Sequence, residues 1–140
     1  MNKSFEVVKA IKKTNNQIIK FETDIVRQYG LTSPQYGVLE CLYIKGDMHI
    51  NELIERLIST SGTMTVIIKN LEKLNFVEKK SDLNDKRFFK ICLTNKGKEL
   101  VEEIFPLRKS QLDDFVDTLT DDEKESLLKI LYKFKVRYKK

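Results

Sequence analysis

A basic segment from Lys79 to Thr94, KKSDLNDKRFFKICLT, combines five lysine and arginine side chains with two aspartates. Phe76 and Val77 lead into this segment, and Phe89, Ile91 and Leu93 alternate with Phe88, Lys90 and Cys92 near its end, which predicts two strands with a turn at Ser81 to Asp85. The basic side chains would attract an anion. Duplex DNA is one such anion, because a narrow minor groove concentrates the negative potential that attracts arginine. We therefore interpret the segment as a basic hairpin, or wing.

The two aspartates at the turn, Asp82 and Asp85, have separate explanations. An aspartate in a turn accepts backbone N–H bonds and holds the bend, and this role alone accounts for Asp82. Asp85 lies two residues before Arg87, so both side chains can project from one side of the hairpin. We predict that the Asp85 carboxylate pairs with the guanidinium of Arg87 and sets its direction before binding.

Two helices precede this hairpin and are joined by only a few residues. The segments HINELIERL (49–57) and STSGTMTVIIKNLEKLN (59–75) both have apolar residues at helical spacing. His49 stands at the capping position of the first helix, and Ser59 or Thr60 at that of the second. The short connection forces the helices to cross steeply, which is helix-turn-helix geometry. Followed at once by the hairpin, the pair predicts a winged helix.

The outer side of the helix within 59–75 carries small hydroxyls, a lysine and an amide. In a winged helix, such a helix lies in the major groove, presents its first turns to base edges and offers free backbone N–H groups to phosphate. A merely solvated helix is the alternative for this element alone, and the adjoining basic hairpin favours DNA. The predicted DNA-binding residues are Thr60, Ser61, Thr63, Thr65, Lys69 and Asn70 of the helix and Asp85, Lys86 and Arg87 of the hairpin.

Longer helices flank this lobe. Isoleucines at seven-residue spacing, Ile11, Ile18 and Ile25, predict a helix from 5 to 29 that packs on another helix of the same chain or of a partner. A second helix has its capping box at Thr32 and Gln35 and ends at Gly46.

Two further helices follow the hairpin. Thr94 caps one from 95 to 118, which Pro106 should kink, and TDDE (120–123) is the capping box of the last. The apolar stripe of the last helix is Leu127, Leu131, Phe134 and Tyr138. The predicted fold class is mainly α (α+β winged helix-turn-helix): four helices, a two-stranded wing and two helices.

The bulk composition indicates one soluble domain. The 140 residues carry a net charge of +5, and the sequence has no apolar run long enough to cross a membrane and no signal peptide. We expect a cytoplasmic protein without a cofactor, because one histidine and two separated cysteines do not make a zinc site. The sequence shows no catalytic nucleophile with its base and no phosphate-binding glycine loop, so we do not expect an enzyme.

Three stretches of the chain resemble the MarR family of bacterial transcriptional regulators: LTSPQYGVLECLY, STSGTMTVIIKNLEKLNFVEKK and SDLNDKRFFKICLTNKG. The last looks like the D-x-x-D-[RK]-R wing signature followed by LT and a glycine. The matching residues are Asp82, Asp85, Lys86, Arg87, Leu93, Thr94 and Gly97. GVLECLYIKG and SGTMTVIIKNLE look like a subgroup associated with quinone, phenolic or oxidative stress.

The resemblance implies one domain over 1–140, with a winged helix-turn-helix lobe at about 32–94 and a helical dimerisation region at about 1–30 and 95–140. It implies a homodimer that represses from a pseudo-palindromic operator and is released by a small aromatic ligand or an oxidant. By the family pattern Val66 joins the recognition-helix positions. Many members carry arginine there and at Asn70, so we expect wing and backbone contacts to supply more of the affinity.

Members of the family often bind aromatic ligands near the dimer helices. By that resemblance the candidate lining residues are Phe21, Tyr29, Tyr36 and Tyr43, with ordinary core packing as the alternative. The candidate redox thiols are Cys41 and Cys92. We expect Cys41 to be buried in its helix. Cys92 shares a strand face with Phe88 and Lys90, which favours an accessible thiol whose pKa the lysine would lower, with an inert thiol as the alternative. A winged-helix module that binds protein instead of DNA remains the alternative function.

Overall fold

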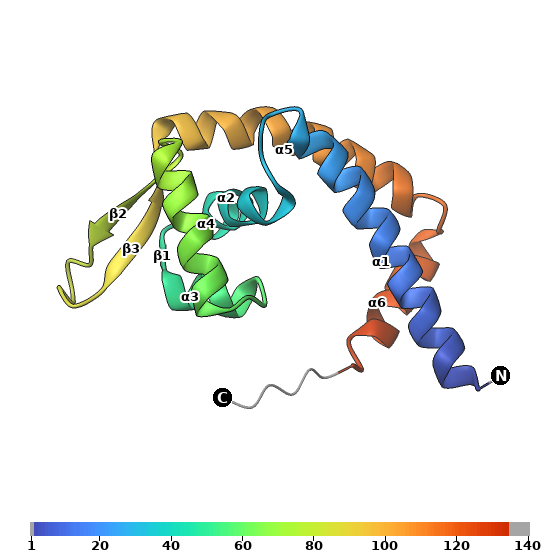
Figure 1. Cartoon of the computed structure of the whole chain (residues 1–140). Coiled ribbons are helices and arrows are strands. Elements are labelled where there is room, and N and C mark those ends of the chain that lie inside the picture. The colour runs from blue at the N-terminus through green and yellow to red at the C-terminus, as the bar shows by residue number, and fades with distance from the viewer. Residues whose placement is uncertain (1, 135–140) are drawn as a thin grey trace. The chain divides into compact units, whose positions relative to one another are not determined.

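The computed structural model describes residues 2–134, and its elements are helical apart from one small sheet (Figure 1). The chain divides into two compact units, Met1–Arg108 and Lys109–Lys140, which we describe separately. The elements are α1 (Lys3–Arg27), α2 (Ser33–Lys45), β1 (Met48–His49), α3 (Ile50–Arg56), α4 (Ser61–Lys73), β2 (Val77–Ser81), β3 (Phe89–Leu93), α5 (Asn95–Val116) and α6 (Asp121–Leu131). The predicted winged helix-turn-helix class is confirmed.

The helix caps lie where the sequence predicts them. Thr32 and Gln35 form a reciprocal capping box before α2, with N···O distances of 3.0 and 3.2 Å. Thr60, the second of the two candidates, accepts the N–H of Thr63 at 3.2 Å and caps α4. Thr120 and Glu123 form the box before α6. These bonds satisfy backbone donors that the first helical turn leaves free, so each helix has a defined start.

The sheet has three strands and not the two that the sequence predicts. Its order is β1-β3-β2, and the added strand β1 pairs Met48 with Ile91 and His49 with Lys90. Two residues are too short a run to show a period of two, so this strand exists only through its pairing with β3. β1 thereby attaches the start of α3 to the hairpin.

The base of the hairpin is fixed to the start of α5. The Thr94 hydroxyl donates to the Asn75 carbonyl oxygen at 2.6 Å and accepts the N–H of Gly97 at 3.0 Å. The Thr94 N–H donates to the Phe76 carbonyl oxygen at 3.1 Å. Figure 1 shows the hairpin leaving the end of α4 and leading back into α5 at this point. The LT…G part of the signature therefore fixes the base of the hairpin to the end of α4 and the start of α5.

One apolar core holds the first unit together. It takes residues from α1 to α5, of which the largest fully buried are Tyr36, Leu39, Leu53, Met64, Ile68, Leu71, Ile91 and Ile104. Most of α1 before Ile25 is exposed, and so is the apolar stripe of α6. Tyr138, which the sequence also assigns to that stripe, lies outside the described residues. Among the described helices, none is long and apolar enough to span a membrane.

Candidate nucleic-acid interface

The predicted recognition helix α4 is amphipathic, with its polar side in solvent. Met64, Ile68 and Leu71 are buried in the core, and these positions turn the opposite side outwards. All seven residues predicted on this helix are exposed: Thr60, Ser61, Thr63, Thr65, Val66, Lys69 and Asn70. Val66 places an exposed apolar side chain in the middle of that polar side.

The four hydroxyls of this face differ in whether they already form a hydrogen bond within the helix. Thr60 caps the helix, and the Thr65 hydroxyl donates to the Ser61 carbonyl oxygen at 2.8 Å. Among the described residues, the side-chain hydroxyls of Ser61 and Thr63 have no such bond. These two hydroxyls can therefore donate to a phosphate or a base without breaking a bond of the fold.

The turn that sets the angle between α3 and α4 contains a strained residue. Ile58 has a φ of +51° and its side chain is 66% exposed. A β-branched residue rarely adopts this left-handed conformation, because its Cβ crowds the backbone. The Ser59 N–H donates to the Ile54 carbonyl oxygen at 2.9 Å, and this hydrogen bond spans Ile58 and ends α3.

The predicted pair of Asp85 and Arg87 is confirmed. Nε and Nη2 of Arg87 donate to the two carboxylate oxygens of Asp85 at 3.0 and 2.9 Å. The bonds from the Arg87 side chain, together with its backbone N–H, hold the pKa of the Asp85 carboxyl below its ordinary value. The Arg87 side chain nevertheless stays 83% exposed, and its guanidinium lies 5.8 Å from the centre of the Phe88 ring. The arginine is oriented without being buried.

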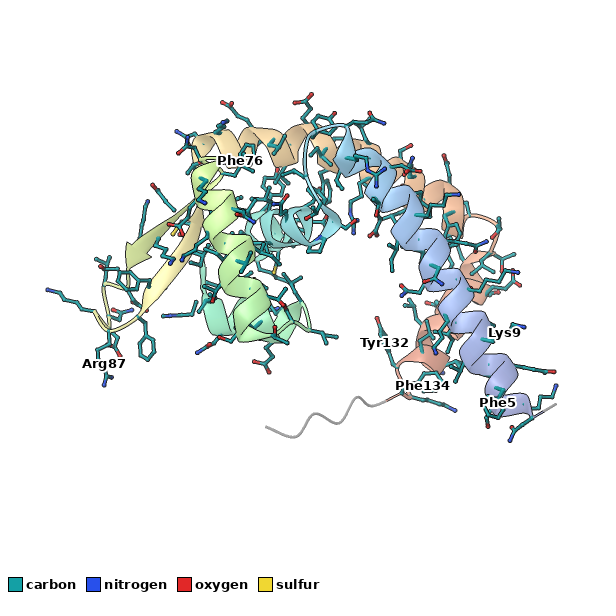
Figure 2. The ribbon with its side chains drawn as sticks, in the orientation of Figure 1. Phe5, Lys9, Phe76, Arg87, Tyr132 and Phe134 are labelled. Carbon is teal, nitrogen blue, oxygen red and sulfur yellow. The ribbon has the colours of Figure 1, made fainter. Side chains whose placement is uncertain are left out.

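Arg87 lies at the free end of the hairpin. Figure 2 shows it there, at the opposite end from Phe76, where the hairpin leaves α4. Lys86 is exposed beside it. Lys79 and Lys80, nearer the base, lie 3.7 and 3.3 Å from carboxylates of Glu72 and Glu78. Of these four basic side chains, Lys86 and Arg87 are therefore the two that lie at the tip of the hairpin.

Asp82 holds the turn, as predicted, and it also makes a contact that the sequence does not predict. Its Oδ1 accepts the N–H of Asn84 at 2.9 Å, and its Oδ2 lies 3.0 Å from Nε2 of His49. The Asn84 N–H is the main cause of a lowered pKa for this carboxyl, with Lys90 and His49 acting in the same direction. No pattern of short spacing links His49 with Asp82, so a local reading of the sequence misses the pair.

Of the four candidate ligand-lining aromatics, Tyr36 is buried, Phe21 and Tyr29 are partly buried, and Tyr43 is exposed. Tyr36 is 2% exposed, Tyr29 packs against the core cluster, and Phe21 is partly buried. The Tyr43 ring packs at 6.2 Å from that of Phe105. This arrangement fits the ordinary-core alternative, and a ligand-binding role for these four residues stays a prediction.

Arg108 makes a second connection that the sequence does not show. Its Nη1 lies 2.9 Å from Oε1 of Glu22, and its Nε lies 2.7 Å from Oε2 of Glu40. One guanidinium of α5 therefore joins α1 to α2. Its carbon also lies 5.6 Å from the centre of the buried Tyr36 ring, and burial, together with the Glu40 carboxylate, raises the pKa of the Tyr36 hydroxyl.

The prediction of an accessible Cys92 is wrong. The residue is 3% exposed, and burial raises the pKa of its thiol to about 11, with Asp47 acting in the same direction and outweighing Lys80. Cys41 is only partly buried, and burial also raises the pKa of its thiol. Both environments disfavour the thiolate, which is the reactive form of cysteine.

Comparison with known proteins connects this geometry with gene regulation. The family described as "Transcriptional regulator SarA/Rot" matches residues 20–104. The chain is 33% identical over 121 residues to the HTH-type transcriptional regulator SarZ of Staphylococcus epidermidis, covering 86% of this chain and 80% of SarZ. It is 28% identical over 106 residues to the HTH-type transcriptional regulator MhqR of Bacillus subtilis, covering 76% and 73%.

The fold has a solved counterpart that was crystallised with DNA. The crystal structure of a mutant MarR from E. coli complexed with operator DNA superposes with a TM-score of 0.83 at 24% identity. The alignment covers 94% of this chain and 95% of that one. This likeness establishes the fold, and the relatives above are transcriptional regulators.

Proposed function

Because the chain belongs to the MarR-like SarA/Rot family of transcriptional regulators, we propose that it is a homodimeric repressor that binds a pseudo-palindromic operator in double-stranded DNA. The observation that carries the proposal is the Asp85–Arg87 pair, because it holds an 83% exposed guanidinium in one direction at the tip of the wing. An arginine held in this way enters a minor groove with less loss of side-chain freedom than a mobile one.

In this proposal two surfaces of the protein contact the DNA. The polar side of α4 lies in the major groove, where Ser61 and Thr63 contact phosphates and base edges. The wing reaches the neighbouring minor groove, with Lys86 and Arg87 beside phosphates. Small hydroxyls discriminate bases less sharply than a bidentate arginine would, so the wing supplies much of the affinity.

Exposed apolar residues on the helices outside the lobe support a homodimer. On α1, Phe5, Val8 and Ile11 are 69%, 49% and 40% exposed. On and just after α6, Leu127, Leu128, Ile130, Leu131, Tyr132 and Phe134 are all exposed. Figure 2 labels Phe5, Tyr132 and Phe134 among these side chains. Apolar surface of this extent is typical of a protein interface, and two copies of one chain would each cover that of the other.

Release by a small aromatic ligand has more support than release by oxidation of a thiol, because burial raises the pKa of both cysteine thiols. The similarity to SarZ and MhqR supports the subgroup associated with quinone, phenolic or oxidative stress. A cytoplasmic location and a role in a stress response complete the proposal.

A specific feature favours the alternative, a winged-helix module that binds another protein. Leu83, Phe88 and Phe89 of the wing are 97%, 47% and 53% exposed, and exposed apolar residues suit a protein partner. In that case the wing would have no sequence preference in DNA.

A titration separates the two functions. Fluorescence anisotropy would compare a duplex from upstream of the protein's own gene, and one enriched from a random pool, with scrambled duplexes at two salt concentrations. Salt-sensitive binding that prefers one sequence supports the repressor, and the salt slope counts the phosphate contacts. Equal, weak binding to every duplex would exclude it and favour a protein partner. Analytical ultracentrifugation of the same samples tests the dimer.

A further inference from the structure

Asp82 is the one charged residue that is buried among those the structure describes. It is 8% exposed, although it lies in the turn of a hairpin whose other residues are mostly in solvent. A buried carboxylate needs partners, because removing its charge from water is costly. The Asn84 N–H satisfies one oxygen from within the turn, and the His49 imidazole, from β1, faces the other at 3.0 Å.

His49 stands where the helix-turn-helix meets the wing. It is the N-cap of α3, and in the sheet it pairs with Lys90 of β3. Its ring lies edge-on to Phe88, with 5.6 Å between ring centres and an interplanar angle of 86°. One side chain thus contacts the wing at both ends of its turn, at Asp82 before it and at Phe88 after it.

These contacts lead directly to the arginine that the proposed function uses. The Asp82 N–H donates to the Phe88 carbonyl oxygen, and the Phe88 N–H donates to the Asp85 carbonyl oxygen, at 3.0 and 3.1 Å. Arg87 lies between Asp85 and Phe88 in the chain, with its guanidinium held by the first and near the ring of the second. A shift of the turn relative to β1 would therefore move Arg87 relative to α4.

We propose that His49 is a positioning residue for the wing: its imidazole braces the turn against the helix-turn-helix through Asp82. The inference rests on the proposed function, since it assumes that the wing contacts DNA. The contact between His49 and Asp82 forms only in the folded protein, because the two residues are far apart in the chain.

The brace should make DNA binding depend on both partners of the contact. One ring nitrogen of His49 meets one carboxylate oxygen of Asp82, so removing either partner frees the turn from β1. The charged groups that face the contact or line the adjoining cavities are Asp82, Asp85, Lys79, Lys80, Arg87 and Lys90 of the hairpin, Glu52 of α3 and Asp47 before β1.

The test compares wild type with His49→Gln and Asp82→Asn, using the random-pool duplex at one pH and constant salt. Glutamine removes the ring that contacts both Asp82 and Phe88. We expect each variant to bind about threefold to tenfold more weakly than wild type.

A double variant and an NMR signal separate positioning from general stability. His49→Gln with Asp82→Asn should bind no more weakly than either single variant, because both remove the same contact. In the free protein, the Asn84 amide signal of His49→Gln should differ from that of wild type, because the Asp82 carboxylate that accepts this N–H loses its contact with the imidazole. All variants must remain folded at the assay temperature, as circular dichroism verifies.

The outcomes distinguish this inference from the proposed function. If wild type binds the duplex and His49→Gln binds it with the same affinity, the positioning role is wrong and the repressor stands. If wild type binds no duplex with sequence preference, the repressor fails and the inference with it.

Discussion

Gly97, in the first turn of α5, lies directly against the carbonyl group of Phe76, at the base of the wing. A Cβ atom on residue 97 would overlap the Phe76 carbonyl oxygen and crowd its carbonyl carbon. Backbone lies on both sides of this contact, so neither partner can rotate away as a side chain could. The glycine of the LT…G signature is therefore required by close approach and not by an unusual backbone angle.

Gly97→Ala should destabilise the protein by about 3 kcal/mol, since overpacking against backbone forces the start of α5 away from the hairpin. Urea unfolding followed by circular dichroism measures the change. The matched control is Gly37→Ala in α2, where a Cβ meets nothing within 4 Å; it should stabilise by roughly 0.5–1 kcal/mol. Equal stability of the Gly97 variant and wild type would contradict the close contact.

Arg87→Ala should weaken DNA binding roughly tenfold or more while leaving the fold intact, because the exposed guanidinium contacts only the wing itself. Anisotropy with the random-pool duplex measures the loss. Lys80→Ala is the control, since it removes the same charge from β2, away from the tip of the wing, and it should have the smaller effect.

Asp85→Ala gives a sharper test of the pair. Removing a negative charge would strengthen DNA binding if only net charge mattered. We expect it to weaken binding about threefold, because Arg87 loses the bonds that direct it. Tighter binding of this variant at both low and high salt would show that orientation of the guanidinium has no role.

Cys92 should be inert in the folded protein. With a thiol pKa of about 11, roughly one molecule in ten thousand carries the thiolate at pH 7. Alkylation with iodoacetamide, followed by mass spectrometry, should label Cys92 only in urea, with Cys41 as the more accessible internal comparison. Rapid labelling of native Cys92 would reopen thiol oxidation as the release mechanism.

The wing should also make the protein sensitive to acid. The Asn84 N–H lowers the folded-state pKa of Asp82, and the bonds from Arg87 lower that of Asp85. Their contribution to stability is present above the unfolded value, about pH 4, and is lost as pH falls through the folded values. The free energy of unfolding should therefore decrease progressively from about pH 5 to below pH 3. Asp82→Asn should show a shallower decrease in urea titrations at stepped pH.

The sequence by itself determines the features that depend on residues close together in the chain. Thr32 with Gln35, Thr120 with Glu123 and Asp85 with Arg87 are two or three positions apart, so the local backbone alone brings them into contact. The helical period likewise identifies which side of α4 faces the core. These local rules were sufficient to predict the winged helix.

Only the tertiary structure decides which distant residues meet. The strand β1 exists because β3 lies beside it, and that pairing brings His49 to Asp82. Arg108 joins Glu22 to Glu40 because three helices converge on it. Cys92 is buried and its thiol has Asp47 as a neighbour, although its alternation with apolar residues predicts exposure. Contacts of this kind depend on how the elements pack, and no short spacing in the sequence encodes them.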